Sequence, residues 1–243
     1  TFLQKPISLW KKYILTCPPR IAAYNINNMF GDIDAVIAAQ GFKSFRKAGT
    51  AARELYGVFF KGKEMSPEMR LWFERGGFES LLQTQEAGKV NQLAIFDRFM
   101  EKQNGIHQIK QFPEKLWRGY WNGTRKVTDF RESILRYAKF LDYREQMREN
   151  NGRPKEFGAS DPAAVMALDN IDDRAFKLSN ELLGAYDSIG EMGQDLRSFV
   201  WPFWSWKEVN AKRYVQMIQN ATIDDKTAAN VAAKVGGLAL RKA

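Results

Sequence analysis

Apolar residues recur along most of this chain at the period of an α-helix, and the strict alternation typical of strands is scarce. The clearest case is a stripe spaced by steps of four and three, namely Phe130, Ile134, Tyr137, Leu141 and Arg144. Such spacing places the side chains on one face of a helix. We therefore predict a helix over about 129–148 and an all-α fold.

Proline, glycine and capping residues mark further helices. Ser-Pro-Glu at 66–68 has the order of a helix start, and the glycines at 76–77 should end that helix. Ser-Asp-Pro at 160–162 opens another, and the acidic pairs at 172–173 and 224–225 are expected at helix starts. Other expected helices cover 7–15, 20–40, 45–59, 78–103, 112–121, 180–193, 207–219 and 222–240. The prediction is an irregular assembly of about eight to ten helices.

The clearest linker is 150–158, which is dense in turn-forming residues. A boundary there would divide the chain into an N-terminal helical region, 1–150, and a C-terminal helical region, 151–243. The alternative is that both regions share one core. Since the chain begins without Met or a signal-peptide pattern, we also expect it to be a piece of a longer polypeptide.

Composition fits a protein with a substantial core, because 44% of residues are hydrophobic and 27% are charged. Lys and Arg outnumber Asp and Glu by 37 to 28, which gives a net charge of +9. This balance favours an anionic partner without choosing among nucleic acid, a membrane surface and an acidic protein. No uncharged apolar run approaches the roughly 18–20 residues that a membrane-spanning helix needs.

Residues suited to catalysis or metal binding are sparse. Cys17 and His107 are the only residues of their types, so neither an internal disulfide nor a Cys/His zinc site can form. Asp32 and Asp34 would diverge on a helix, and Asp32 is better interpreted as a cap for a helix over 33–40. No phosphate-binding glycine loop is present. We expect no enzyme activity, no cofactor and no metal site.

Two segments, 43–63 and 110–131, each carry six positive residues, against one and two negative residues respectively. The second is also rich in aromatic residues, a mixture that suits binding to a nucleic-acid backbone or single strand. The simpler interpretation is a solvated basic helix face with its rings in the core. The candidate nucleic-acid-binding residues are Lys110, Lys115, Trp117, Arg118, Tyr120, Trp121, Arg125 and Lys126.

Residues 198–206 contain five aromatic rings, and Pro202 is well placed to begin the helix that follows. That helix would carry one apolar stripe of Trp204, Ala211, Val215 and Ile218, with Trp206, Val209 and Met217 on the opposite side. A helix with two apolar faces is normally buried between neighbours. It is therefore either a central core helix or a docking surface for another chain or for the bilayer interface. The candidate docking residues are Trp201, Phe203, Trp204, Trp206 and Asn210.

Several of these motifs together resemble a helical domain of large phage polyvalent proteins. The C-terminal match comprises Leu183-Gly184-Ala185-Tyr186-Asp187, Leu196-Arg197-Ser198-Phe199, Pro202-Phe203-Trp204-Ser205-Trp206 and Asn210. The N-terminal match comprises Trp10-Lys11-Lys12, Pro19-Arg20, Tyr24-Asn25 and Gly31-Asp32-Ile33-Asp34-Ala35-Val36. The segment between them, about 43–180, matches by helicity alone. The resemblance implies a segment of a large virion protein that is carried in the capsid and ejected with the genome, and it supplies no catalytic residues.

Three functions follow as expectations. The preferred one is a structural segment of a phage internal virion (DNA-ejection) protein that packs with itself or with sister proteins near the genome conduit. The alternatives are a nucleic-acid-binding module and a module that enters the bacterial membrane after ejection. The expected location is the virion, inside the capsid or near the portal, and then the host envelope or cytoplasm.

Overall fold

The structure, a computed structural model, describes residues 18–78, 112–185, 204–224, 231–232 and 235–236 of the 243-residue chain. These residues form seven α-helices, one 3-10 helix and no strand, which confirms the all-α prediction; the helices are fewer than the eight to ten expected for the whole chain. In order they are α2 (Pro18–Gln40), η1 (Gly41–Phe45), α3 (Ala48–Lys61), α4 (Pro67–Glu74), α7 (Phe112–Glu149), α8 (Pro162–Met166), α9 (Ile171–Leu182) and α11 (Trp204–Asp224).

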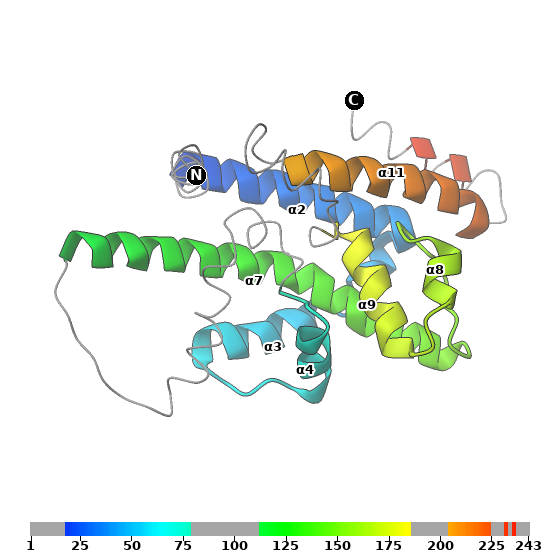
Figure 1. Cartoon of the computed structure of the whole chain (residues 1–243), viewed down its shortest axis with the longest axis horizontal. Helices are drawn as coiled ribbons and strands as arrows, with labels where there is room; N and C mark the ends of the chain where they lie inside the picture. The colour runs from blue at the N-terminus through cyan, green and yellow to red at the C-terminus, as the bar shows by residue number, and fades with distance from the viewer. Residues whose placement is uncertain (1–17, 79–111, 186–203, 225–230, 233–234, 237–243) are drawn as a thin grey trace, which may run out of the picture.

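The long helix α7 is the axis of the molecule (Figure 1). The helices α3, α4 and α9 pack against its C-terminal half, α2 makes fewer contacts with it, and α11 approaches α2 where Arg213 donates to the carbonyl of Gly31. One hydrophobic cluster joins residues from both sides of the 150–158 linker, from Ala35 to Met217. Its largest fully buried side chains include Trp72, Tyr137 and Phe140.

Helix α7 corrects the sequence interpretation, which placed a short helix over 112–121 and a separate one over 129–148. The structure has one continuous helix of 38 residues that runs through Gly123. Glycine weakens a helix by only about 1 kcal/mol, and packing of the C-terminal half can offset that cost. The predicted stripe is confirmed in part: Tyr137 and Arg144 are buried, and Phe130, Ile134 and Leu141 are partly buried against the core.

The capping predictions are mostly confirmed. The backbone N–H of Met69 donates to Ser66 Oγ over 3.2 Å at the start of α4, and that of Ala163 donates to Asp161 Oδ1 over 3.1 Å at the start of α8. The acids at 172–173 lie in the first turn of α9. Asp224 does not begin a helix, since it is the last residue of α11, where its carboxylate accepts a hydrogen bond from the backbone of residue 157.

Two other expectations about helices were wrong. Helix α2 continues through residue 32, so Asp32 is not a cap. The segment expected to begin a helix at residue 180 instead ends one, because α9 stops at Leu182 and Gly184 follows with a φ of +92°. The predicted helices over 7–15 and 78–103, together with Cys17 and His107, lie outside the described residues.

Gly77 lies against the indole of Trp72, the largest fully buried side chain. A Cβ at Gly77 would come within 2.4 Å of Trp72 Cδ2. Trp72 in turn packs edge-on against Phe78, with ring centroids 5.0 Å apart. The turn after α4 therefore needs a residue without a side chain at this position.

Candidate functional site

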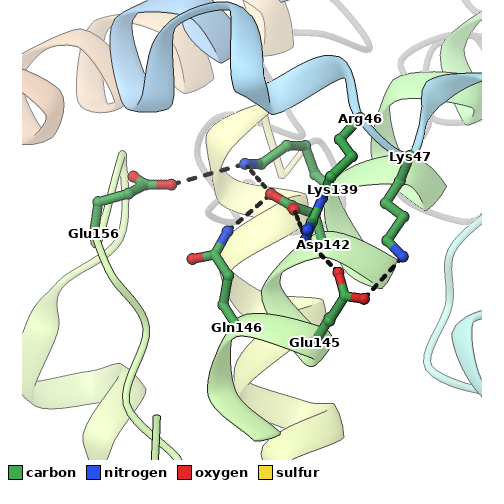
Figure 2. A network of polar contacts seen from close by, with 7 residues as sticks. All are labelled: Arg46, Lys47, Lys139, Asp142, Glu145, Gln146 and Glu156. Carbon is green, nitrogen blue, oxygen red and sulfur yellow. Dashed lines mark hydrogen bonds and ion pairs between the residues drawn. The ribbon is translucent and has the colours of Figure 1, made fainter. Parts of the chain in front are cut away.

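A chain of charged side chains crosses the interior of the molecule beside α7 (Figure 2). Lys139 and Asp142 are only 1% and 3% exposed, and Lys139 Nζ lies 3.2 Å from Asp142 Oδ2. Glu156, in the segment between α7 and α8, places Oε1 3.8 Å from the same ammonium. Because an unpaired charge is costly to bury, Lys139 is held between two carboxylates.

Neighbouring polar groups complete the inner part of this network. Gln146 Nε2 donates to Asp142 Oδ2 over 2.8 Å, and the Tyr143 hydroxyl donates to Glu156 Oε1 over 2.5 Å. The Lys139 ammonium also lies 4.2 Å from the centre of the Tyr143 ring. Burial, with the adjacent Glu156 carboxylate, raises the pKa of the Tyr143 phenol well above its usual value. The phenol is therefore a neutral hydrogen-bond donor at physiological pH.

The network reaches the surface at the turn between η1 and α3. Arg46 donates to both Asp142, over 3.3 Å, and Glu145, and Lys47 Nζ donates to Glu145 over 3.1 Å. The hydrogen bond from Lys47 is the main cause that lowers the pKa of Glu145. These contacts join residues nearly one hundred positions apart, so the network fastens the η1–α3 turn to α7.

Arg136 makes a second buried link, from α7 to the end of α9. Its guanidinium donates to Asn180 Oδ1 over 2.8 Å and to the backbone carbonyls of Leu183 and Gly184 over 3.0 and 2.8 Å. Carbonyls at a helix C-terminus lack partners within the helix, and a cation there is favourable. Arg136 therefore caps α9 from a neighbouring helix.

Asp32 joins three helices. Its carboxylate lies 3.5 Å from Arg131 Nη1 of α7 and 3.9 Å from Arg213 Nη1 of α11. Arg213 Nη2 also donates to the carbonyl of Gly31 over 3.0 Å. The pairing of Asp32 with two arginines, in place of the predicted capping role, holds α2 against α7 and α11.

Glu54 of α3 is shared by two hydroxyl donors. The Ser66 and Tyr137 hydroxyls each donate to Glu54 Oε2 over 2.8 Å. Burial is the main cause that raises the pKa of Tyr137 above its usual value. Glu54 therefore links α3 to α7 through Tyr137 and to the start of α4 through Ser66.

The predicted docking residues fall at and before the start of α11. Trp201 and Phe203 lie outside the described residues, and Trp204 and Trp206 belong to the first turn of α11, where the structure describes no side chains. Asn210 is 6% exposed, on the side of α11 that faces the rest of the molecule. Of the five predicted docking side chains, the structure therefore describes only that of Asn210, and that side chain is buried.

The predicted nucleic-acid-binding residues lie on or before the first half of α7. Lys110 lies outside the described residues, and Lys126 is the one candidate whose side chain is described. The backbone alone is described at the six others, which are Lys115, Trp117, Arg118, Tyr120, Trp121 and Arg125. Packing of α3 against α7 brings the two basic segments of the sequence together.

The sequence analysis made no prediction for Lys139, Asp142 and Glu156, so the buried ionic network was missed. These buried charged side chains connect neighbouring helices.

Among the described residues no cluster of three or more His, Cys, Asp or Glu side chains could hold a metal ion. No described helix is long and apolar enough to cross a membrane. Searches of protein-family models, curated proteins and solved structures found no significant match to this chain.

Proposed function

We propose that this chain is a helical assembly segment of a phage internal virion protein that packs with copies of itself or with sister proteins near the genome conduit. The phage assignment rests on the sequence resemblance described above. The assembly role rests mainly on one observation, which is that α11 leaves the aliphatic side chains Val215 and Ile218 exposed on the side opposite its hydrogen-bonded buried residues. The charged groups of the network pair with one another and tie helices together.

The inner face of α11 is held by directional hydrogen bonds. Asn210, Arg213 and Asn220 are all buried, at 6%, 4% and 0% exposure. Asn220 Nδ2 donates to the carbonyls of Gly158 and Ser160 over 2.9 and 2.7 Å. Polar groups buried with their partners fix position and register more than they add net stability. These hydrogen bonds therefore fix the position and register of α11 on the rest of the molecule.

The outer face of α11 carries aliphatic side chains on successive turns. Val215 is 57% exposed and Ile218 is 43% exposed, with Ala211 exposed one turn earlier. Full burial of one such Val or Ile side chain is worth about 1.5–3 kcal/mol. The neighbouring α2 also exposes apolar side chains, Phe30 among them at 58%. Clustered exposed apolar residues are typical of protein interfaces, so we assign the outer face of α11 to contact with another chain.

Replacement of one residue on this face tests the proposal. Ile218→Lys should weaken self-association of the chain in sedimentation velocity while its helical circular dichroism stays unchanged. Gln219→Lys is the matched control, because it adds the same charge on the same turn at an exposed polar position. A wild-type chain that stays monomeric at high concentration, or an Ile218→Lys variant that associates like Gln219→Lys, contradicts assembly through α11. In a phage that encodes the chain, Ile218→Lys should also reduce its incorporation into virions.

A further inference from the structure

Two aromatic rings stand exposed on the outer side of α3. Tyr56 and Phe60 are 47% and 42% exposed, one turn apart on the same helix. Their rings stack with centroids 5.2 Å apart and planes inclined by 30°. Part of each aromatic side chain is therefore accessible to solvent, and accessible aromatic rings are groups on which bases of nucleic acid can stack.

Rings packed beneath hold this pair in position. Phe130 of α7 meets Phe60 edge-on, with centroids 5.2 Å apart and planes at 86°. Phe59 lies 5.9 Å from Phe130 and 5.4 Å from Phe78. The exposed pair is therefore the outer end of an aromatic cluster that continues into the core, so little side-chain entropy would be lost when a ligand stacks on it.

Cations surround the exposed rings. Lys126 Nζ lies 4.7 Å from the centre of the Phe60 ring, and Lys61 Nζ lies 5.4 Å from the centre of the Tyr56 ring. Arg53 is exposed one turn before Tyr56 on the same side of α3. Within the part of the chain that the structure describes, neither Arg53 nor Lys61 forms an ion pair. The local field is therefore positive beside Tyr56.

The one acidic residue of α3 does not cancel this charge. Glu54 accepts the hydroxyl hydrogen bonds of Ser66 and Tyr137, on the side of α3 that faces α4 and α7. A ligand at Tyr56 and Phe60 would therefore meet cations and rings together. An acidic peptide would use only the cations of this site, and an apolar peptide would use only its rings. The combination of the two therefore favours a ligand that has both negative charge and aromatic faces.

We propose that Tyr56 and Phe60 form a stacking platform for single-stranded nucleic acid, with Arg53, Lys61 and Lys126 contacting its phosphates. Unpaired bases offer their faces to such rings, whereas the bases of a duplex are already stacked on one another. This site goes beyond the proposed assembly function and uses α3 and α7, not α11. Only Lys126 belongs to the set that the sequence indicated.

Binding of fluorescently labelled oligothymidine, measured by anisotropy at low salt, tests the platform. Tyr56→Leu removes the ring but keeps an apolar side chain, and should weaken binding roughly 5- to 150-fold, the range for loss of one stacked base. Tyr56→Phe keeps the ring and should bind like the wild type. Phe42→Ala is the matched control, because Phe42 is 81% exposed on η1, away from the platform.

The salt dependence tests the cations separately. Lys61→Gln should reduce the slope of log affinity against log salt by about 0.7, as expected for one lost phosphate contact with a single strand. Lys155→Gln, at an exposed position beyond α7, should leave the slope unchanged.

Three results would overturn the platform. One is a wild-type chain that fails to bind oligothymidine at low salt. Another is Tyr56→Leu that binds as tightly as Tyr56→Phe, which would leave only diffuse charge attraction. The third is duplex DNA, polyglutamate or vesicles of phosphatidylcholine and phosphatidylglycerol that bind more tightly than the oligonucleotide. Self-association of the chain is measured independently, so either proposal can fail alone.

Discussion

Removal of the Lys139 ammonium should destabilise this protein far more than removal of an ammonium from its surface. Lys139→Met keeps the length and much of the volume of the side chain, so the change is mainly electrostatic. It leaves the buried carboxylates of Asp142 and Glu156 without the cation that lies between them.

The magnitude follows from what each carboxylate retains. Breaking a buried ion pair by removing one partner costs about 3–5 kcal/mol. Asp142 keeps its hydrogen bonds from Arg46 and Gln146, and Glu156 keeps that from Tyr143. We therefore expect the lower end of the range, about 3 kcal/mol. Removal of the Asp142 carboxylate as well, in Lys139→Met with Asp142→Leu, should recover part of this loss.

Urea unfolding followed by circular dichroism measures the effect. Lys177→Met is the matched control, since Lys177 pairs with Glu181 four residues later on α9 and both side chains are more than a quarter exposed. That variant should lose no more than about 0.5 kcal/mol. Equal unfolding free energies for Lys139→Met and Lys177→Met would refute the claim that burial makes the Lys139 network a tie between helices.

Two further predictions concern two glycine positions and the two buried phenols. Gly77→Ala should cost about 1–3 kcal/mol, because its methyl group would displace the fully buried Trp72, whereas Gly123→Ala, with nothing within 4 Å, should add about 0.5–1 kcal/mol to the urea-unfolding free energy. Burial raises the pKa of Tyr137 and Tyr143, so the folded chain keeps protons that the unfolded chain loses, and stability should fall as pH rises above about 10. The difference in tyrosinate absorbance between the wild type and Tyr137→Phe or Tyr143→Phe isolates these two phenols, which should ionise only on unfolding; a difference that appears in the folded chain near pH 10 would contradict this.

Local signals in the sequence predicted the parts of the fold that depend on local physics. The hydroxyl of Ser66 and the ring of Pro67 act within one helical turn, so the start of α4 could be placed from three residues. The stripe through Tyr137 identified the C-terminal half of α7, because apolar spacing alone decides that face.

Long-range pairing could not be predicted in the same way. Lys139, Asp142 and Arg136 have the composition of a solvated helix face, and their burial depends on partners in η1, α9 and the 156 region. The two apolar stripes of α11 were recognisable, yet nothing local distinguishes the buried side, with Met217, from the exposed side, with Val215. The sequence therefore indicates which side chains are apolar enough to be buried, but which of them are covered depends on contacts with distant helices.

The separation of the ionic partners along the chain has a consequence for synthesis. Arg46 and Lys47 precede their acceptors Asp142 and Glu145 by 96 and 98 residues. At about 5–20 residues per second, a ribosome needs roughly 5–20 seconds to deliver α7 after it has made the η1–α3 turn. During that interval the aromatic side of α3 lacks the ring of Phe130, which packs against Phe59 and Phe60 in the finished protein. The nascent chain should therefore be most dependent on chaperones over this stretch, and codon changes that slow translation between α4 and α7 should lower the folded yield without altering the finished protein.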